Sequence, residues 1–122
     1  MFKSTLFAVT LAASLSTAVH ANDFNDGVYA AEAGDYATAM AKWMPLAEHG
    51  NADAQFNVAL ALHKGLGVPA DESYAVGWYH LAANNGNVHA QEFLIAAYSE
   101  GWFGLARDPE LAAYWEQRLN DQ

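Results

Sequence analysis

The 122-residue sequence contains no cysteine and only five lysine and arginine residues, against 14 aspartate and glutamate residues. Without cysteine the chain has no disulfide, no thiol nucleophile and no cysteine for a lipid anchor. The scarcity of positive charge argues against nucleic acid and anionic lipid as partners, because both are bound by clustered lysine and arginine. The formal charge of −9 is compatible with a basic partner, and equally with acidity that only keeps the protein soluble.

Side chains that carry catalysis are also sparse. Ser73 falls in the first turn of a predicted helix, where a capping role is expected. The histidines after residue 21 lie on separate predicted segments, without the four-residue spacing of a helical zinc site: His49, His63, His80 and His89. Gly65-Leu66-Gly67 lacks the Lys-Ser/Thr pair of a phosphate-binding loop. We therefore predict no catalytic residue, no metal and no cofactor.

The first 21 residues have the three-part layout of a secretory signal. Lys3 is followed by an apolar run over residues 6–15, and Val19-His20-Ala21 offers small residues at the −3 and −1 positions of a cleavage site. We expect cleavage after Ala21 and a periplasmic or secreted protein. No later run is long enough for a membrane helix, so we expect no integral membrane segment in the mature form.

Glycines, prolines and capping residues divide the remainder, predicted to be one domain over residues 22–122, into six helical segments. Aspartate or asparagine precedes most of the segments, and glycine follows them. The predicted helices span residues 24–33, 36–48, 51–64, 72–84, 87–100 and 109–120. No segment alternates with period two, so no sheet is expected.

The sequence repeats itself at a spacing of 36 residues. Matched residues include Asn51 and Asn87, Ala54-Gln55 and Ala90-Gln91, and Gly65 and Gly101. Beyond the turn the spacing becomes 37, matching Gly67 with Gly104, Asp71 with Asp108 and Trp78 with Trp115, because Trp102-Phe103 stands in place of Leu66. Asp35, Ala39, Ala47 and Gly50 match Asp71, Ala75, Ala83 and Gly86 at 36. The expected repeat units are about 22–50, 51–86 and 87–122.

The central unit resembles the Sel1-like repeat family, a relative of the tetratricopeptide repeat. The resemblance rests on these residues: Ala54, Leu62, Gly65-Leu66-Gly67-Val68, Asp71, Ala75, Trp78-Tyr79, Ala82-Ala83 and Gly86. It implies an all-α fold, a short right-handed α-solenoid of three helix-turn-helix repeats with six helices. Family members are mostly scaffolds or adaptors. Exported bacterial members are similar to regulators of envelope signalling, secretion or polysaccharide machinery, and some resemble toxin-neutralising partners.

In tetratricopeptide-like arrays the partner lies on the concave face lined by the first helix of each pair. By analogy the partner-binding residues are Phe24, Val28, Asp53, Phe56, Leu60, His63, His89, Glu92 and Ala96. The apolar ones among them either anchor a peptide or pack on neighbouring first helices. Trp102 and Phe103 are either an interaction hot spot or a cap folded back over the last helix pair.

The leading hypothesis is an exported module that binds a protein or peptide partner in the cell envelope, as a scaffold, adaptor or regulator. One alternative is a small carboxylate-dependent hydrolase of cell-wall or peptide substrates, which requires two carboxylates converging in a deep pocket. Another is a structural subunit whose ends stack into an oligomer.

Overall fold

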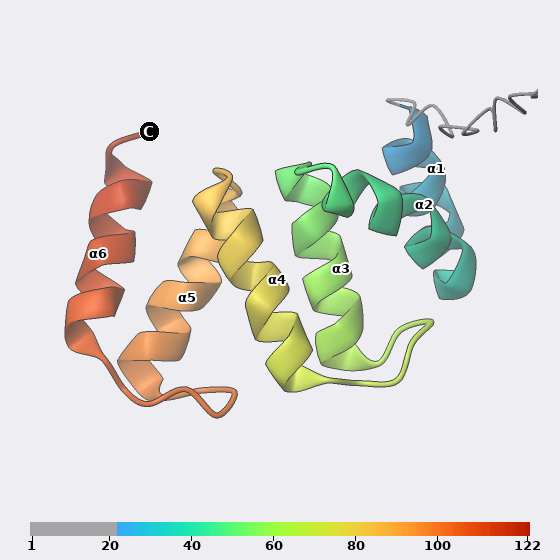
Figure 1. Ribbon diagram of the computed structural model, residues 1–122. Coiled ribbons are helices and arrows are strands. Elements are labelled where there is room, and N and C mark those ends of the chain that lie inside the picture. Colours follow the sequence, from blue (N-terminus) through green and yellow to red (C-terminus); the bar gives the residue numbers. More distant parts are fainter. Residues whose placement is uncertain (1–21) are drawn as a thin grey trace, which may run out of the picture.

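The computed structural model describes residues 22–122, and all regular structure in that range is helical (Figure 1). The helices are α1 (Asn22–Glu32), α2 (Tyr36–Glu48), α3 (Ala52–Lys64), α4 (Glu72–Asn84), α5 (Val88–Glu100) and α6 (Pro109–Asn120). The all-α prediction is confirmed, and each boundary lies within two residues of its predicted place. Helix α1 begins earlier than predicted, so Asn22 and Asp23 form its first turn. The predicted signal peptide lies outside the described residues.

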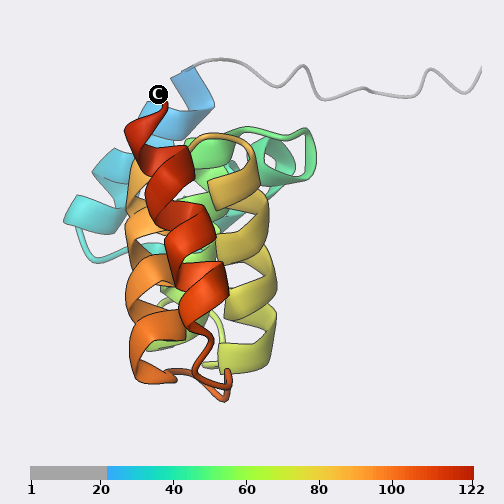
Figure 2. The same cartoon turned by 90° about the vertical axis from the view of Figure 1, so that its left-hand side faces the viewer.

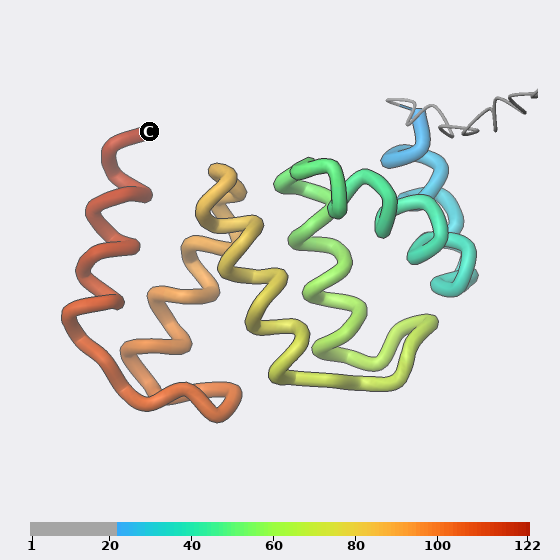
Figure 3. The backbone as a smooth tube through the Cα atoms, viewed as in Figure 1, coloured from blue at the N-terminus to red at the C-terminus, as the bar shows by residue number. Residues whose placement is uncertain are grey.

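The helices form three antiparallel pairs that follow one another across the molecule in chain order (Figure 3). Each helix packs mainly against the helices next to it in sequence. Viewed along the array, α6 lies in front, with α4 and α5 on opposite sides behind it (Figure 2). The fold is therefore a short helical solenoid, as predicted. None of the helices in residues 22–122 is long and apolar enough to cross a membrane.

The helix ends repeat the same chemistry in successive units. The side chains of Asp35, Asp71 and Asp108 accept hydrogen bonds from backbone N–H groups in the first turns of α2, α4 and α6. Gly65 and Gly101 end α3 and α5 in the left-handed region, with φ of 71° and 73°. These equivalent positions carry the same conformation, as the 36-residue repeat predicts.

Burial follows the repeat as well. Ala54 and Ala90 are fully buried, and so are Val58 and Leu94 at the next equivalent position. A buried glutamine then links each unit to the one before it: the side-chain amide of Gln55 donates to the Ala47 carbonyl, and that of Gln91 to the Ala83 carbonyl, both at 3.0 Å. Small residues at the centre let the helices approach closely. Each glutamine adds a buried hydrogen bond between units, to a carbonyl that also accepts from the backbone N–H of Gly50 or Gly86.

Candidate partner-binding face

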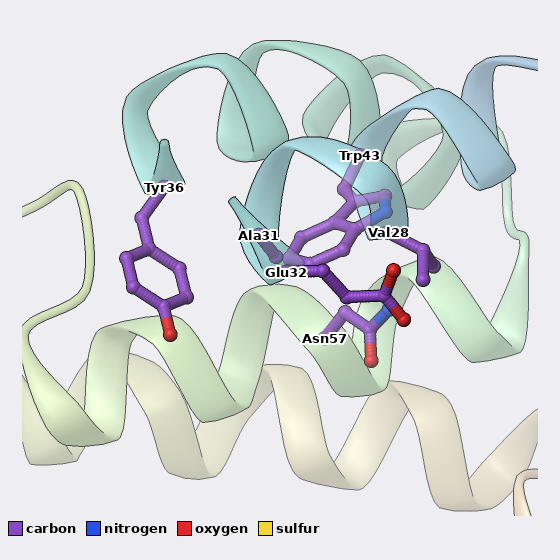
Figure 4. Close-up of a pocket in the computed structure, with 6 residues that line it drawn as sticks. All are labelled: Val28, Ala31, Glu32, Tyr36, Trp43 and Asn57. Atoms are coloured by element: carbon purple, nitrogen blue, oxygen red, sulfur yellow. The ribbon is translucent and has the colours of Figure 1, made fainter. Parts of the chain in front are cut away.

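Two open grooves lie side by side on the face formed by α1, α3 and α5 with the inner sides of α2 and α4, called here the first-helix face. The first groove, of about 380 Å³, is lined by Val28, Ala31, Glu32, Tyr36, Trp43 and Asn57 (Figure 4). The second groove, of about 540 Å³, is lined by Phe56, Leu60, His63, Tyr79, His89, Glu92 and Phe93. A smaller depression of about 230 Å³ shares Trp43 and Asn57 with the first groove and Leu60 with the second. An extended ligand can therefore run across both.

The two grooves occupy equivalent places in successive repeats. Trp43 and Tyr79 are 36 residues apart, as are Asn57 and Phe93. The first unit has a shorter turn, so residues of its first helix align with those of α3 at a spacing of 32 residues. Phe24 therefore matches Phe56. The Phe24 and Trp43 ring centroids lie 6.4 Å apart, and those of Phe56 and Tyr79 lie 5.9 Å apart. The same scaffold thus presents two different sets of side chains.

The second groove has an aromatic floor. The Tyr79 and Phe93 rings stack with centroids 3.8 Å apart and planes 19° from parallel, which joins α4 to α5. The Tyr79 hydroxyl lies 3.2 Å from Nδ1 of His63, within hydrogen-bond distance. Burial raises the pKa of Tyr79 to about 12, because the charged phenolate is poorly solvated there. The floor is therefore apolar and uncharged near neutral pH.

Phe103 packs against two residues that line the second groove. Its ring meets the His63 ring edge-on with centroids 4.3 Å apart and lies 5.0 Å from that of Phe93. The backbone N–H of Leu66 donates to the carbonyl of Ala61, and that of Trp102 donates to the carbonyl of Ala97 in the same way. Trp102 therefore occupies the place of Leu66, which leaves Phe103 as the inserted residue of the last turn. Phe103 adopts a positive φ of 57°. Its neighbour Trp102 is 47% exposed.

The rim of the second groove is polar. Nδ1 of His89 lies 3.5 Å from a carboxylate oxygen of Glu92, and both side chains are largely exposed. The His89 ring also lies 5.7 Å from that of Phe56. Asp53, which does not line the groove, accepts a hydrogen bond of 2.9 Å from the side-chain amide of Asn87 and so ties α3 to the start of α5. An apolar floor with a polar, partly acidic rim is the usual anatomy of a protein-binding surface.

The aromatic wall of the first groove is held from two sides. The Trp43 indole Nε1–H donates to the Phe24 carbonyl at 3.1 Å. A Cβ added at Gly27 would overlap the Trp43 ring, so only glycine lets α1 approach it this closely. Gly67, with φ of 71°, packs against the backbone of Tyr36 and fixes the start of α2. Packing between the first and second units therefore fixes the shape of the first groove.

The predicted site residues have different places in the structure. Val28 lines the first groove, and Phe56, Leu60, His63, His89 and Glu92 line the second. Phe24 contacts Trp43, Asp53 is bonded to Asn87, and Ala96 is half-buried and lines neither groove. The Phe103 ring folds back onto Phe93 of the last helix pair, which is the contact expected of a cap. It also contacts His63 of the central pair. Trp102 stays exposed.

Sequence reasoning missed the groove residues on the second helices. Tyr36, Trp43 and Tyr79 come from α2 and α4, whereas the analogy considered first helices only. The contrast between Asn57 and Phe93 was also missed, although the 36-residue alignment places them at one position. A comparison of side-chain size at equivalent positions would have found this signal.

The acidic and histidine side chains of the described residues are dispersed rather than gathered at one metal site. No group of three or more histidine, aspartate or glutamate side chains in residues 22–122 is arranged to hold a metal ion. Each groove is lined by a single carboxylate, Glu32 in the first and Glu92 in the second. The paired carboxylates that the hydrolase alternative requires are not found in either groove.

Comparisons with known proteins agree with this architecture. The Sel1 repeat family matches residues 52–87 and 90–119, more than half of the chain. The structure is similar to that of a protective antigen present in uropathogenic Escherichia coli strains that displays an SLR fold, with 30% identity and a TM-score of 0.72 over 82% of this chain and 22% of that one. It is also similar to a Sel1 repeat protein from Oxalobacter formigenes, with 30% identity and a TM-score of 0.74 over 81% of this chain and 42% of that one. The chain spans less than half the length of either protein. Comparison with curated proteins gives no match. The chain belongs to the Sel1 repeat family.

Proposed function

We propose that this chain is an exported interaction module that holds a segment of a partner protein on its first-helix face, in the cell envelope. Sel1 repeat proteins generally mediate protein–protein interactions, and their fold is typically a non-enzymatic scaffold. The observation that carries the proposal is the second groove, whose open volume of about 540 Å³ is lined mainly by apolar and aromatic side chains. Such a surface gains free energy when an apolar partner side chain displaces water from it.

The second groove suits an anchor side chain on an extended or helical segment. Tyr79 is 1% exposed and supports the groove from beneath. Phe56 is half-buried on the groove wall, and its ring contacts both Tyr79 and His89. Rigid aromatic walls of this kind lose little side-chain entropy when a partner binds, and such positions often dominate binding energy.

The envelope location rests on residues 1–21, whose charge, apolar run and small residues match a secretory signal. A role as scaffold, adaptor or regulator, including one that neutralises a toxin, follows from the family resemblance. The acidic character of the chain favours a basic partner.

The proposal is tested by Phe56→Asp, which places a charge in the second groove. Partner capture from the envelope fraction should fall at least tenfold, because burying the new carboxylate beneath an apolar anchor costs more than about 1.4 kcal/mol. Tyr74→Asp is the matched control, since Tyr74 is 51% exposed and lies on α4 outside this groove. Both variants must keep the helical circular dichroism of the wild type. Full capture by a folded Phe56→Asp variant would refute the assignment of the groove.

A further inference from the structure

We infer that the first groove is a separate subsite that takes an arginine side chain of the partner segment. The inference rests on the proposed function, because the partner must lie on the first-helix face to reach this groove. It extends that proposal from one apolar anchor to a pair of unlike contacts, an apolar residue in the second groove and an arginine in the first.

The first observation is that the aromatic filler of the second groove is missing from the first. Phe93 stacks on Tyr79 at 3.8 Å and occupies the space between α4 and α5. At the equivalent position beside Trp43 stands Asn57, which is smaller and polar. The exchange leaves room beside the indole and lines it with an amide that donates and accepts hydrogen bonds.

The second observation is the charge of the first groove. Glu32 lines it and forms no ion pair with any other described residue. Figure 4 shows that Glu32 from α1, Trp43 from α2 and Asn57 from α3 line the same groove. A cation that enters this groove therefore meets the Glu32 carboxylate, the Asn57 amide oxygen and the Trp43 side chain.

The third observation sets where the cation goes and which cation fits best. Lys64 lines the adjoining depression, which shares Trp43 and Asn57 with the first groove, so an entering cation is repelled on the Lys64 side and attracted on the Glu32 side. A guanidinium group is planar, packs flat against aromatic rings and binds a carboxylate through two parallel hydrogen bonds. Lysine has the same charge, but it lacks the planar group that can lie against the Trp43 ring and pair with the Glu32 carboxylate through two hydrogen bonds.

The test uses N-acetyl-arginine N-methylamide as the probe and its citrulline analogue as the uncharged control of the same shape. The probe is titrated into the ¹⁵N-labelled protein by NMR, and the indole N–H of Trp43 and the side-chain amide of Asn57 report on the groove. We expect saturating shifts for the arginine probe in the millimolar range, and binding roughly three- to tenfold weaker for citrulline.

Two variants complete the test. Glu32→Gln should reduce arginine affinity about three- to tenfold, to the level of citrulline, whereas Glu116→Gln, an exposed acidic residue on α6, should leave it unchanged. Asn57→Phe should abolish the shift at Trp43 while the protein stays folded, because it introduces the residue type found at the equivalent position.

Equal affinity for arginine and citrulline, or an unchanged affinity in Glu32→Gln or Asn57→Phe, would overturn the inference. These outcomes are separable from failure of the proposed function. Phe56 lines the second groove and not the first, and the probe carries no apolar anchor. An absent arginine site with intact Phe56-dependent capture would therefore overturn the inference alone.

Discussion

The two grooves of the first-helix face share one backbone plan and differ in their side chains. In the second groove, Phe93 stacks on Tyr79 and leaves an apolar floor. In the first, Asn57 stands in place of Phe93, and a tryptophan in place of the tyrosine is held against α1 by Gly27. The core residues that define the repeat stay small or apolar in both units. A helical repeat can therefore keep its packing constant while the groove positions change their chemistry.

The largest expected effect comes from exchanging the groove residues. Phe93→Asn should lower the free energy of unfolding by about 2–3 kcal/mol, because it removes the ring that contacts Tyr79 and Phe103. The reverse exchange, Asn57→Phe, fills open space and should change stability by less than about 1 kcal/mol. Urea unfolding of both variants measures this. Equal losses would mean that the two sites are not structurally different.

The next effect concerns how closely the first helix of each unit, α1 or α3, approaches the aromatic residue on the second helix. Gly27→Ala should lower stability by about 2 kcal/mol, since the new methyl group displaces the Trp43 indole from its hydrogen bond with the Phe24 carbonyl. At the equivalent position Ala59 is fully buried, and Ala59→Gly should cost about 1 kcal/mol through helix propensity and the lost methyl group. Thermal unfolding of the pair is the measurement. A stabilising Gly27→Ala would contradict the close packing described for the first unit.

The smallest effect is a dependence on pH confined to the second groove. Burial raises the pKa of Tyr79 to about 12 in the folded protein, while a tyrosine in the unfolded chain ionises near 10. As the pH rises, Tyr79 therefore loses its proton first in the unfolded state. The contribution of neutral Tyr79 to the free energy of unfolding is complete below about pH 10 and is lost as the pH rises toward 12. We expect a loss of roughly 1–2 kcal/mol, reduced by solvent at the groove.

Tyr79→Phe is the control for this titration, and its stability should fall less steeply over the same range. Burial and Asp108 also raise the pKa of Tyr98, but this group is present in both proteins and its effect cancels in the difference. Denaturant unfolding at several pH values measures this difference. If the free energy of unfolding falls equally with pH in both proteins, Tyr79 is not protected from ionisation. The first groove has Trp43 at this position, which does not titrate.

Much of the fold was predictable because local chemistry and the repeat agree. Capping aspartates, glycines after α3 and α5, and the 36-residue spacing place the helices to within two residues. The start of α1 was predicted late because Asn22 and Asp23 are typical capping residues, yet here they lie within the helix.

The site was less predictable because groove shape depends on contacts between units. Phe56 and Leu60 were identified by analogy with tetratricopeptide-like arrays, but the roles of Trp43 and Tyr79 depend on how α2 and α4 pack against the neighbouring first helices. The direction of Phe103 depends on a positive φ that sequence rules assign to glycine, and the central unit has no equivalent residue because Phe103 is inserted. The orientations of these three aromatic side chains are set by contacts between repeats, which local sequence propensities do not predict.

The central claim is that a partner binds on the first-helix face. It is tested most directly by placing the photocrosslinking residue p-benzoylphenylalanine at Phe56 or at Tyr74 in the full chain and irradiating living cells of the native host. Both positions are aromatic, but only Phe56 lines the second groove. If a partner binds on the first-helix face, irradiation should give a discrete crosslinked protein adduct from Phe56 and none from Tyr74. An adduct from Tyr74 with none from Phe56 would contradict it.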